Sequence, residues 1–168
     1  MNTFGYAGSS QEIHPRVLET LNAAGVTYEV VGHSQFDRPI RSPEDFAQAA
    51  QCKVGAVAKS ILLKSVEPEA LVMVVLPNKA SIDLEAVKRT VGLSSVSLVN
   101  RKDVEALTSQ QMNGISPVGH DIISILMDES LFEHPSVFVG TGGAGQELKI
   151  GPEQLQQITN ARKGTFSL

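Results

Sequence analysis

Two apolar runs separated by only three residues limit most strongly how this chain can fold. The runs span residues 61–66 and 71–76, and Glu67, Pro68 and Glu69 lie between them. Runs rich in valine, isoleucine and leucine that are bounded by a short polar loop are typical of a β-hairpin. We expect the two strands to pair antiparallel, which excludes a purely parallel sheet.

Helices and further short strands alternate along the rest of the chain. Apolar spacing and capping residues predict helices at residues 14–24, 42–51, 83–91, 102–107 and 152–158. Runs of β-forming residues predict further strands at residues 28–31, 96–99, 122–127, 137–139 and 148–150. This order predicts an α/β (α+β) fold with a mixed, barrel-like sheet surrounded by helices.

The length of 168 residues predicts a single domain, residues 1–168, because no repeat or linker divides the chain. Residues 1–10 lack the basic and apolar regions of a secretory signal, and we expect them to form a loose arm. The strongly apolar stretch at residues 70–76 is far shorter than the roughly 20 residues of a membrane-spanning helix. We therefore expect a cytoplasmic protein with no membrane partner.

The charge balance limits how the protein can bind nucleic acid. Its 14 Lys and Arg residues are outnumbered by 18 Asp and Glu residues, which gives a net charge of −4. Binding through a wide basic surface needs many cations that neutralise phosphates. Any contact with RNA is therefore expected to be local.

The glycine-rich segment at residues 140–145 formally contains the fingerprint of dinucleotide-binding proteins and follows a predicted strand. That fingerprint requires a helix directly after the glycines and an acidic residue about 20 positions further on. Here residues 146–150 have the pattern of a strand, and Thr165 occupies the place of the acid. We interpret the segment as a glycine turn between two strands and expect no cofactor.

Residues that usually form metal or thiol sites are sparse. The histidines His14, His33, His120 and His134 are scattered, without the short-range Cys, Asp or Glu partners of a zinc site, so no metal is expected. The single cysteine, Cys52, excludes an intrachain disulfide. It lies beside small apolar residues, where a buried thiol is more common than a catalytic one.

Lys59 is unusual because it lies inside an apolar segment, residues 54–63, at the start of a core strand. Burying its ammonium group would be unfavourable. The side chain must therefore reach solvent, balance a helix C-terminus or point into a polar pocket where its charge serves a ligand. The surrounding residues alone favour the structural alternatives over the functional one.

A turn-rich loop at residues 113–119 lies between a predicted helix and a predicted strand. The main-chain amides and carbonyls of such a loop can hold a small polar group or a water molecule. The same composition is also found in loops that only reverse the direction of the chain. By itself, the loop does not decide between these two alternatives.

Several separated motifs together resemble the YbaK / prolyl-tRNA synthetase-associated editing domain family. They are residues 58–64 around Lys59, the strand and helix at 72–92, the loop at 114–119, and the glycine turn at 140–145 followed by Leu155. Their order and spacing match the family from residue 14 to residue 159. The resemblance implies a compact α/β domain that hydrolyses the ester between an amino acid and the terminal ribose of misacylated tRNA. The chief substrate it implies is mischarged prolyl tRNA.

The resemblance also implies roles for individual residues. Lys59 is expected to be the catalytic residue, acting as an electrostatic anchor and not as a Schiff base. The other site residues are expected to bind the substrate; they are Asn113, Gly114, Ile115, Ser116, Pro117, Thr141, Gly142, Gly143 and Glu147. The implied partner is the acceptor end of aminoacyl-tRNA, with a synthetase in a transient complex as a further candidate.

One position departs from the family pattern, because Asn113 stands where the pattern has glycine. Asparagine tolerates a left-handed backbone better than other residues with side chains, so we expect the loop shape to persist. Its amide adds bulk and hydrogen-bonding groups, which favours a small substrate. The alternative hypothesis is a noncatalytic module of the same fold that binds a nucleotide or an aminoacyl group.

Overall fold

The computed structural model describes residues 13–168, so the predicted loose arm at residues 1–10 lies outside the described residues. The strands are β1 (Tyr28–Gly32), β2 (Ala58–Val66), β3 (Glu69–Pro77), β4 (Ser97–Leu98), β5 (Ile123–Asp128), β6 (Val137–Gly140), β7 (Gln146–Ile150) and β8 (Arg162–Gly164). The α-helices are α1 (Pro15–Ala24), α2 (Pro43–Ala50), α3 (Leu84–Val91), α4 (Arg101–Thr108) and α5 (Pro152–Thr159). Short 3-10 turns are η1 (His33–Gln35), η2 (Val54–Ala56), η3 (Met112–Gly114) and η4 (Glu129–Glu133).

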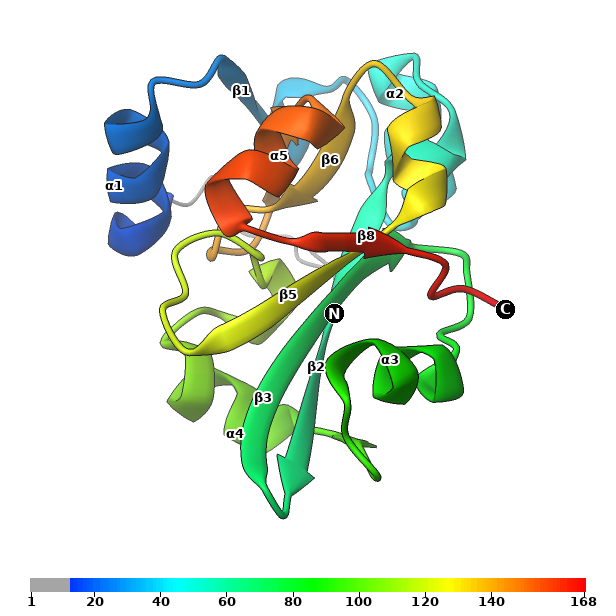
Figure 1. Cartoon of the computed structure of the whole chain (residues 1–168). Coiled ribbons are helices and arrows are strands. Elements are labelled where there is room, and N and C mark those ends of the chain that lie inside the picture. The colour runs from blue at the N-terminus through cyan, green and yellow to red at the C-terminus, as the bar shows by residue number, and fades with distance from the viewer. Residues whose placement is uncertain (1–12) are drawn as a thin grey trace.

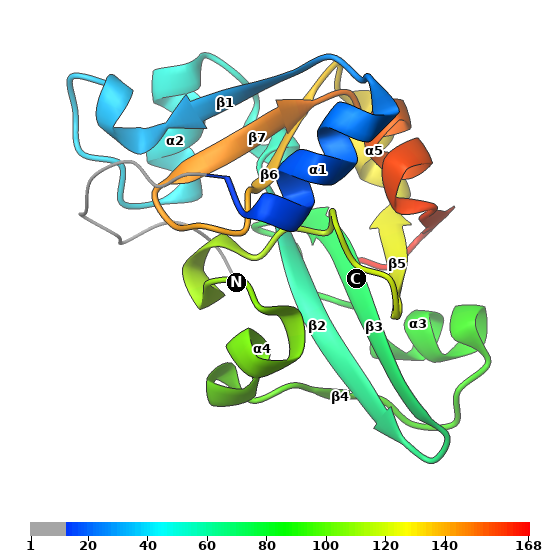
Figure 2. The ribbon, with the colours of Figure 1, turned by 90° about the vertical axis from the view of Figure 1, so that its left-hand side faces the viewer.

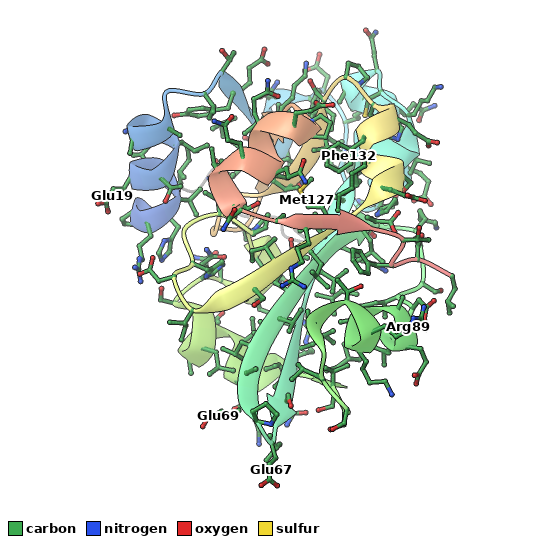
Figure 3. All side chains as sticks on the ribbon, viewed as in Figure 1. Glu19, Glu67, Glu69, Arg89, Met127 and Phe132 are labelled. Carbon is green, nitrogen blue, oxygen red and sulfur yellow. The ribbon has the colours of Figure 1, made fainter. Side chains whose placement is uncertain are left out.

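The predicted antiparallel hairpin is confirmed. Strands β2 and β3 pair antiparallel along their whole length, from Ala58 opposite Pro77 to Val66 opposite Glu69. The connecting loop is one residue shorter than expected, because Glu69 already belongs to β3. Figure 3 shows Glu67 and Glu69 at the tip of the hairpin, pointing away from the protein.

The strands form two sheets, and the mixed α/β character expected from the sequence is confirmed. A three-stranded antiparallel sheet has the order β1-β7-β6, and a five-stranded sheet has the order β4-β2-β3-β5-β8. The larger sheet is mixed, because β5 pairs parallel with both β3 and β8. The two sheets do not close into a barrel: β6 is short, and Val57 bridges Phe138 at a single position between them.

The helices begin and end where their capping residues stand. Ser42 Oγ accepts a hydrogen bond from the Asp45 amide at the start of α2, at 3.0 Å. Gly92 ends α3 with a φ of 71°, a left-handed conformation that suits glycine. Asn100 occupies the N-cap position of α4, but its side chain makes no capping bond. Among residues 13–168, no helix has the length and apolar character that crossing a membrane requires.

Three apolar clusters hold the layers together. The largest fills the space between the two sheets and includes Leu21 of α1, Met73 of β3 and Leu148 of β7. A second cluster lies on the other face of the larger sheet, under α3, and a third packs α2 against the smaller sheet through Phe46 and Phe138. Figures 1 and 2 show α3 and α4 beside the long hairpin and α1, α2 and α5 around the smaller sheet.

Candidate functional site

The two predicted substrate-binding segments pack directly against each other beyond the end of β6. The Gly142 amide donates to the Gly114 carbonyl at 2.7 Å, and the Gln111 amide donates to the Gly142 carbonyl at 3.0 Å. A Cβ atom on Gly114 would lie 2.2 Å from the Gly143 carbonyl oxygen. Only glycine permits so close an approach, so the loop and the glycine turn behave as one structural unit.

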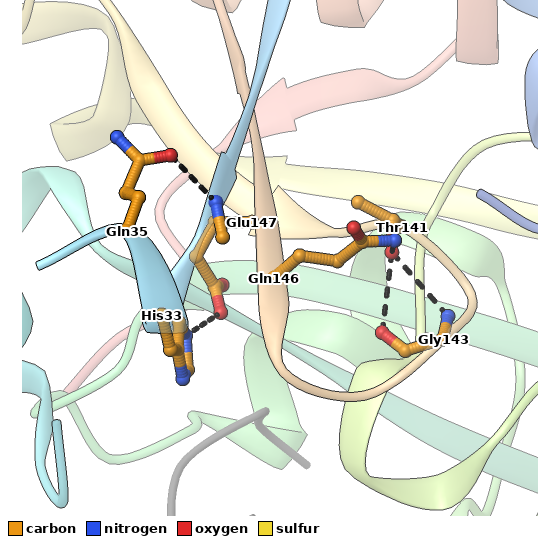
Figure 4. Close-up of polar contacts among 7 residues, drawn as sticks. His33, Gln35, Thr141, Gly143, Gln146 and Glu147 are labelled. Atoms are coloured by element: carbon orange, nitrogen blue, oxygen red, sulfur yellow. Dashed lines mark hydrogen bonds and ion pairs between the residues drawn. The ribbon is translucent and has the colours of Figure 1, made fainter. Parts of the chain in front are cut away.

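The glycine turn is held from inside by Thr141 (Figure 4). Thr141 Oγ1 donates to the Gly143 carbonyl at 3.1 Å and accepts from Gln146 Nε2 at 3.0 Å. Gly142 has a φ of 89°, in the left-handed region where a side chain would be strained. The turn connects β6 directly to β7, which confirms the interpretation of the segment as a turn between strands.

Asn113 lies half-buried at the start of the loop, within η3. Its φ of −85° and ψ of 17° belong to an ordinary turn conformation. Asn113 therefore does not occupy a left-handed position, contrary to expectation, and the backbone there suits most residues. What distinguishes this chain from the family pattern is the amide side chain itself.

Lys59 is the second residue of β2 and pairs with Leu76 of β3. Alternation along β2 places it on the same face as Ile61. The side chain is half-buried, and desolvation by burial lowers the pKa of its ammonium group. Among residues 13–168, the Lys59 ammonium has no hydrogen-bond or ion-pair partner, the loop and the glycine turn included. Val57, two positions before Lys59, bridges Phe138 of β6, so the start of β2 lies close to β6.

Glu147 of β7 lies opposite Gly140 of β6, and its side chain is bound to a residue that the sequence did not indicate. Glu147 Oε2 and His33 Nε2 are hydrogen bonded at 2.8 Å, and the two residues are 2% and 8% exposed (Figure 4). Burial raises the pKa of Glu147 to about 7, and the hydrogen bond to His33 opposes that rise. The His33 amide also donates to the Gly145 carbonyl at 2.9 Å, so His33 contacts both the end of the glycine turn and the strand that follows it.

The His33–Glu147 pair could not be predicted from local patterns, because 114 positions separate the two residues. In the sequence, His33 is one of four scattered histidines, and the pairing of β1 with β7 brings it to Glu147. Cys52 is half-buried after α2, and burial raises the pKa of its thiol, which opposes a nucleophilic role. In the described part of the chain, no three His, Cys, Asp or Glu side chains gather as metal ligands.

Comparison with known proteins identifies a family whose model matches the part of the chain that contains these features. Residues 37–158 match the model of the aminoacyl-tRNA editing domain, a range that includes Lys59, the loop at 113–117 and the glycine turn. A relative from Enterococcus faecalis, named "Putative Cys-tRNA(Pro)/Cys-tRNA(Cys) deacylase EbsC", is 24% identical over 122 residues, which cover 72% of this chain and 74% of the relative.

Solved structures show the same fold. A crystal structure titled "putative trans-editing enzyme for prolyl tRNA synthetase" is 23% identical with a TM-score of 0.77, over 94% of this chain and 99% of that chain. The structure of a hypothetical protein is 22% identical with a TM-score of 0.79, over 91% of this chain and 99% of that chain. The resemblance deduced from the sequence motifs is confirmed, and the chain belongs to the aminoacyl-tRNA editing domain family.

Proposed function

We propose that this protein acts in trans on misacylated prolyl tRNA and hydrolyses the ester that joins a small, wrongly attached amino acid to the terminal ribose. As a member of the editing domain family, the protein is an aminoacyl-tRNA deacylase and therefore a hydrolase. The proposed site rests on one observation. Lys59 is half-buried, and its ammonium has no counter-charge within residues 13–168. A desolvated cation without a partner is best compensated by an anionic ligand.

The proposed chemistry relies on positioning and charge, because an aminoacyl ester is already activated toward hydrolysis. Water adds to the ester carbonyl carbon, the bond to the ribose oxygen breaks, and that oxygen takes up a proton as the free amino acid leaves. Lys59 would stabilise the negative charge that develops on the carbonyl oxygen or the charge of the adjacent phosphate. Main-chain groups of the loop at 113–117 would orient the water and the aminoacyl group without a covalent intermediate.

The substrate class rests on two further considerations. The Enterococcus faecalis relative is named for cysteine attached to prolyl or cysteinyl tRNA, and cysteine is a small amino acid. In this chain, Asn113 adds a side-chain amide to the loop of the proposed site. We therefore propose prolyl tRNA carrying cysteine, alanine or serine as the substrates to test first. The proposed partner is the acceptor end of the tRNA, with a synthetase joining in a transient complex.

The test is deacylation of a panel of mischarged tRNAs by the purified protein, the Lys59→Ala variant and a Lys64→Ala control. Lys64 lies on the same strand and is also half-buried, but its side chain lines a separate hollow beside α4. We expect Lys59→Ala to abolish deacylation and to change the melting temperature as little as Lys64→Ala does. Normal turnover by a folded Lys59→Ala variant would show that the reaction does not require Lys59. Binding of aminoacyl-tRNA without turnover by the parent protein would favour a noncatalytic module.

A further inference from the structure

Gln110 is a buried polar residue two positions after the end of α4, shortly before the loop of the proposed site; it is 2% exposed. Its Oε1 accepts from the Ser116 amide at 2.7 Å, and its Nε2 donates to the Val118 carbonyl at 3.3 Å. A main-chain amide can only donate and a carbonyl can only accept, so both contacts require the same orientation of the carboxamide. The side chain therefore bridges the peptide groups on the two sides of Pro117.

Such a bridge matters because Pro117 has no N–H group and the segment around it belongs to no strand or helix. Two other side chains complete the support. Ser116 Oγ accepts from the Val118 amide at 3.1 Å, and His120 Nε2 donates to the Ser116 carbonyl at 2.8 Å. Burial lowers the pKa of His120 and so favours its neutral ring. Side chains thus hold the segment around Pro117, and Gln110 supplies two of their bonds.

The segment that Gln110 supports packs tightly against the glycine turn at residues 140–145. Gln111 Oε1 accepts from the Ala144 amide at 2.9 Å, in addition to the main-chain bonds between the loop and Gly142. A Cβ atom on Gly140 would lie 2.1 Å from the Ile115 carbonyl oxygen. Contacts this close leave little room to absorb a shift, so a displacement of the loop would also move the glycine turn.

We infer that Gln110 is a positioning residue of the proposed site. One side of the loop faces the aminoacyl group, and the Gln110 carboxamide holds the loop from the opposite side. This inference rests on the proposed function. Gln110 does not touch the reacting atoms; it sets where the loop stands, and so it affects turnover and the discrimination between small and large amino acids. A misplacement of about 1 Å in such a site can lower the rate about 100-fold.

The test compares Gln110→Met, which keeps the length of the side chain and removes both bonds, with Gln156→Met. Gln156 lies on α5, where its Nε2 donates to the Ala161 carbonyl at 3.3 Å, so the control loses a comparable bond away from the site. We expect Gln110→Met to lower kcat by about 10- to 100-fold with little change in KM. We also expect it to change the ratio of deacylation rates for small and large amino acids. Gln156→Met should leave all three quantities at parental values.

A second variant keeps the inference testable if Gln110→Met folds poorly. Gln110→Glu retains the acceptor for Ser116 but offers Val118 a donor only when its carboxyl is protonated. Because the position is buried, the pKa of the introduced carboxyl should lie above its ordinary value. The kcat of the variant relative to the parent should therefore rise as the pH is lowered. Parental kinetics in both variants would overturn the role of Gln110, and so would equal losses in Gln110→Met and Gln156→Met. A parent protein that deacylates none of the tRNAs would instead remove the proposed function.

Discussion

At the scale of single residues, the buried carboxyl of Glu147 links protonation to stability. Burial raises its pKa from 4.5 to about 7, whereas the unfolded chain titrates near 4.5, so the native state binds more protons between these pH values. Its stabilising contribution is present below pH 4.5 and is lost as the pH rises through about 7. The pKa change corresponds to about 3 kcal/mol.

We therefore expect the Glu147→Gln variant to have a flatter profile of unfolding free energy than the parent between pH 5 and pH 8. The parent should lose up to about 3 kcal/mol more than the variant across this interval. Urea unfolding at several pH values provides the measurement, with Glu19→Gln on the exposed surface of α1 as the control. Parallel profiles for the parent and Glu147→Gln would show that folding does not raise the pKa of Glu147.

The side-chain amide of Asn113 is expected to limit the size of the amino acid that the proposed site accepts. Its backbone conformation is open to glycine, so Asn113→Gly removes the amide without forcing the loop to change. We expect the variant to accept larger amino acids, because one changed contact in a site contributes about 1–3 kcal/mol of discrimination. The measurement is the ratio of deacylation rates for tRNAs with small and large amino acids. Asn160→Gly, at the C-cap of α5, is the matched control, and equal ratios in all three proteins would mean that Asn113 points away from the substrate.

At the scale of elements, Asp128 at the end of β5 attaches the C-terminal segment to the larger sheet. Its Oδ1 accepts from the Phe166 and Ser167 amides at 2.7 and 3.0 Å, and its Oδ2 accepts from the Ser130 amide at 3.2 Å. The residue is 1% exposed, so its removal would leave buried amides without partners. We expect Asp128→Ala to lower the unfolding free energy by about 3–5 kcal/mol.

The comparison for this prediction is Asp83→Ala, which removes the N-cap of α3, where the carboxylate accepts from the Ala86 amide at 3.1 Å. Loss of such a cap costs about 1 kcal/mol. Urea unfolding of the two variants measures the difference directly. Similar losses in both would mean that the C-terminal segment finds other partners when Asp128 is absent.

The elements also show which features a sequence reveals. The hairpin and the α-helices were predictable because their determinants are local: two apolar runs joined by a short polar loop, helical apolar spacing, Ser42 as a cap and Gly92 as a stop. Strand β8 was not predicted, since it is three residues long, largely exposed and defined by its pairing with β5. The supports of the proposed site, Gln110 and His33, were missed for the same reason. Their roles depend on partners that only the folded chain brings within reach.

At the scale of the whole molecule, charge decides how tRNA can bind. Several cations are already engaged, since Arg16, Lys79 and Lys88 form ion pairs with Asp121, Glu44 and Glu85. The remaining cations are still outnumbered by acidic residues, since the net charge over the chain is −4, and this opposes a wide basic surface for phosphate contacts. This balance favours a contact confined to the acceptor end over a footprint along the body of the tRNA.

We therefore expect the affinity for tRNA to fall only modestly with salt. Each phosphate neutralised contributes about 0.7–0.9 to the slope of log K against log salt, so a contact with one to three phosphates gives a slope of about −1 to −3. The measurement uses prolyl tRNA that carries alanine through a stable amide bond, titrated against the protein between 50 and 300 mM KCl. A minihelix containing only the acceptor stem is the control and should bind as tightly as the whole tRNA, with the same slope. A slope steeper than about −5, or much weaker binding of the minihelix, would mean that the protein contacts the tRNA far beyond its acceptor end.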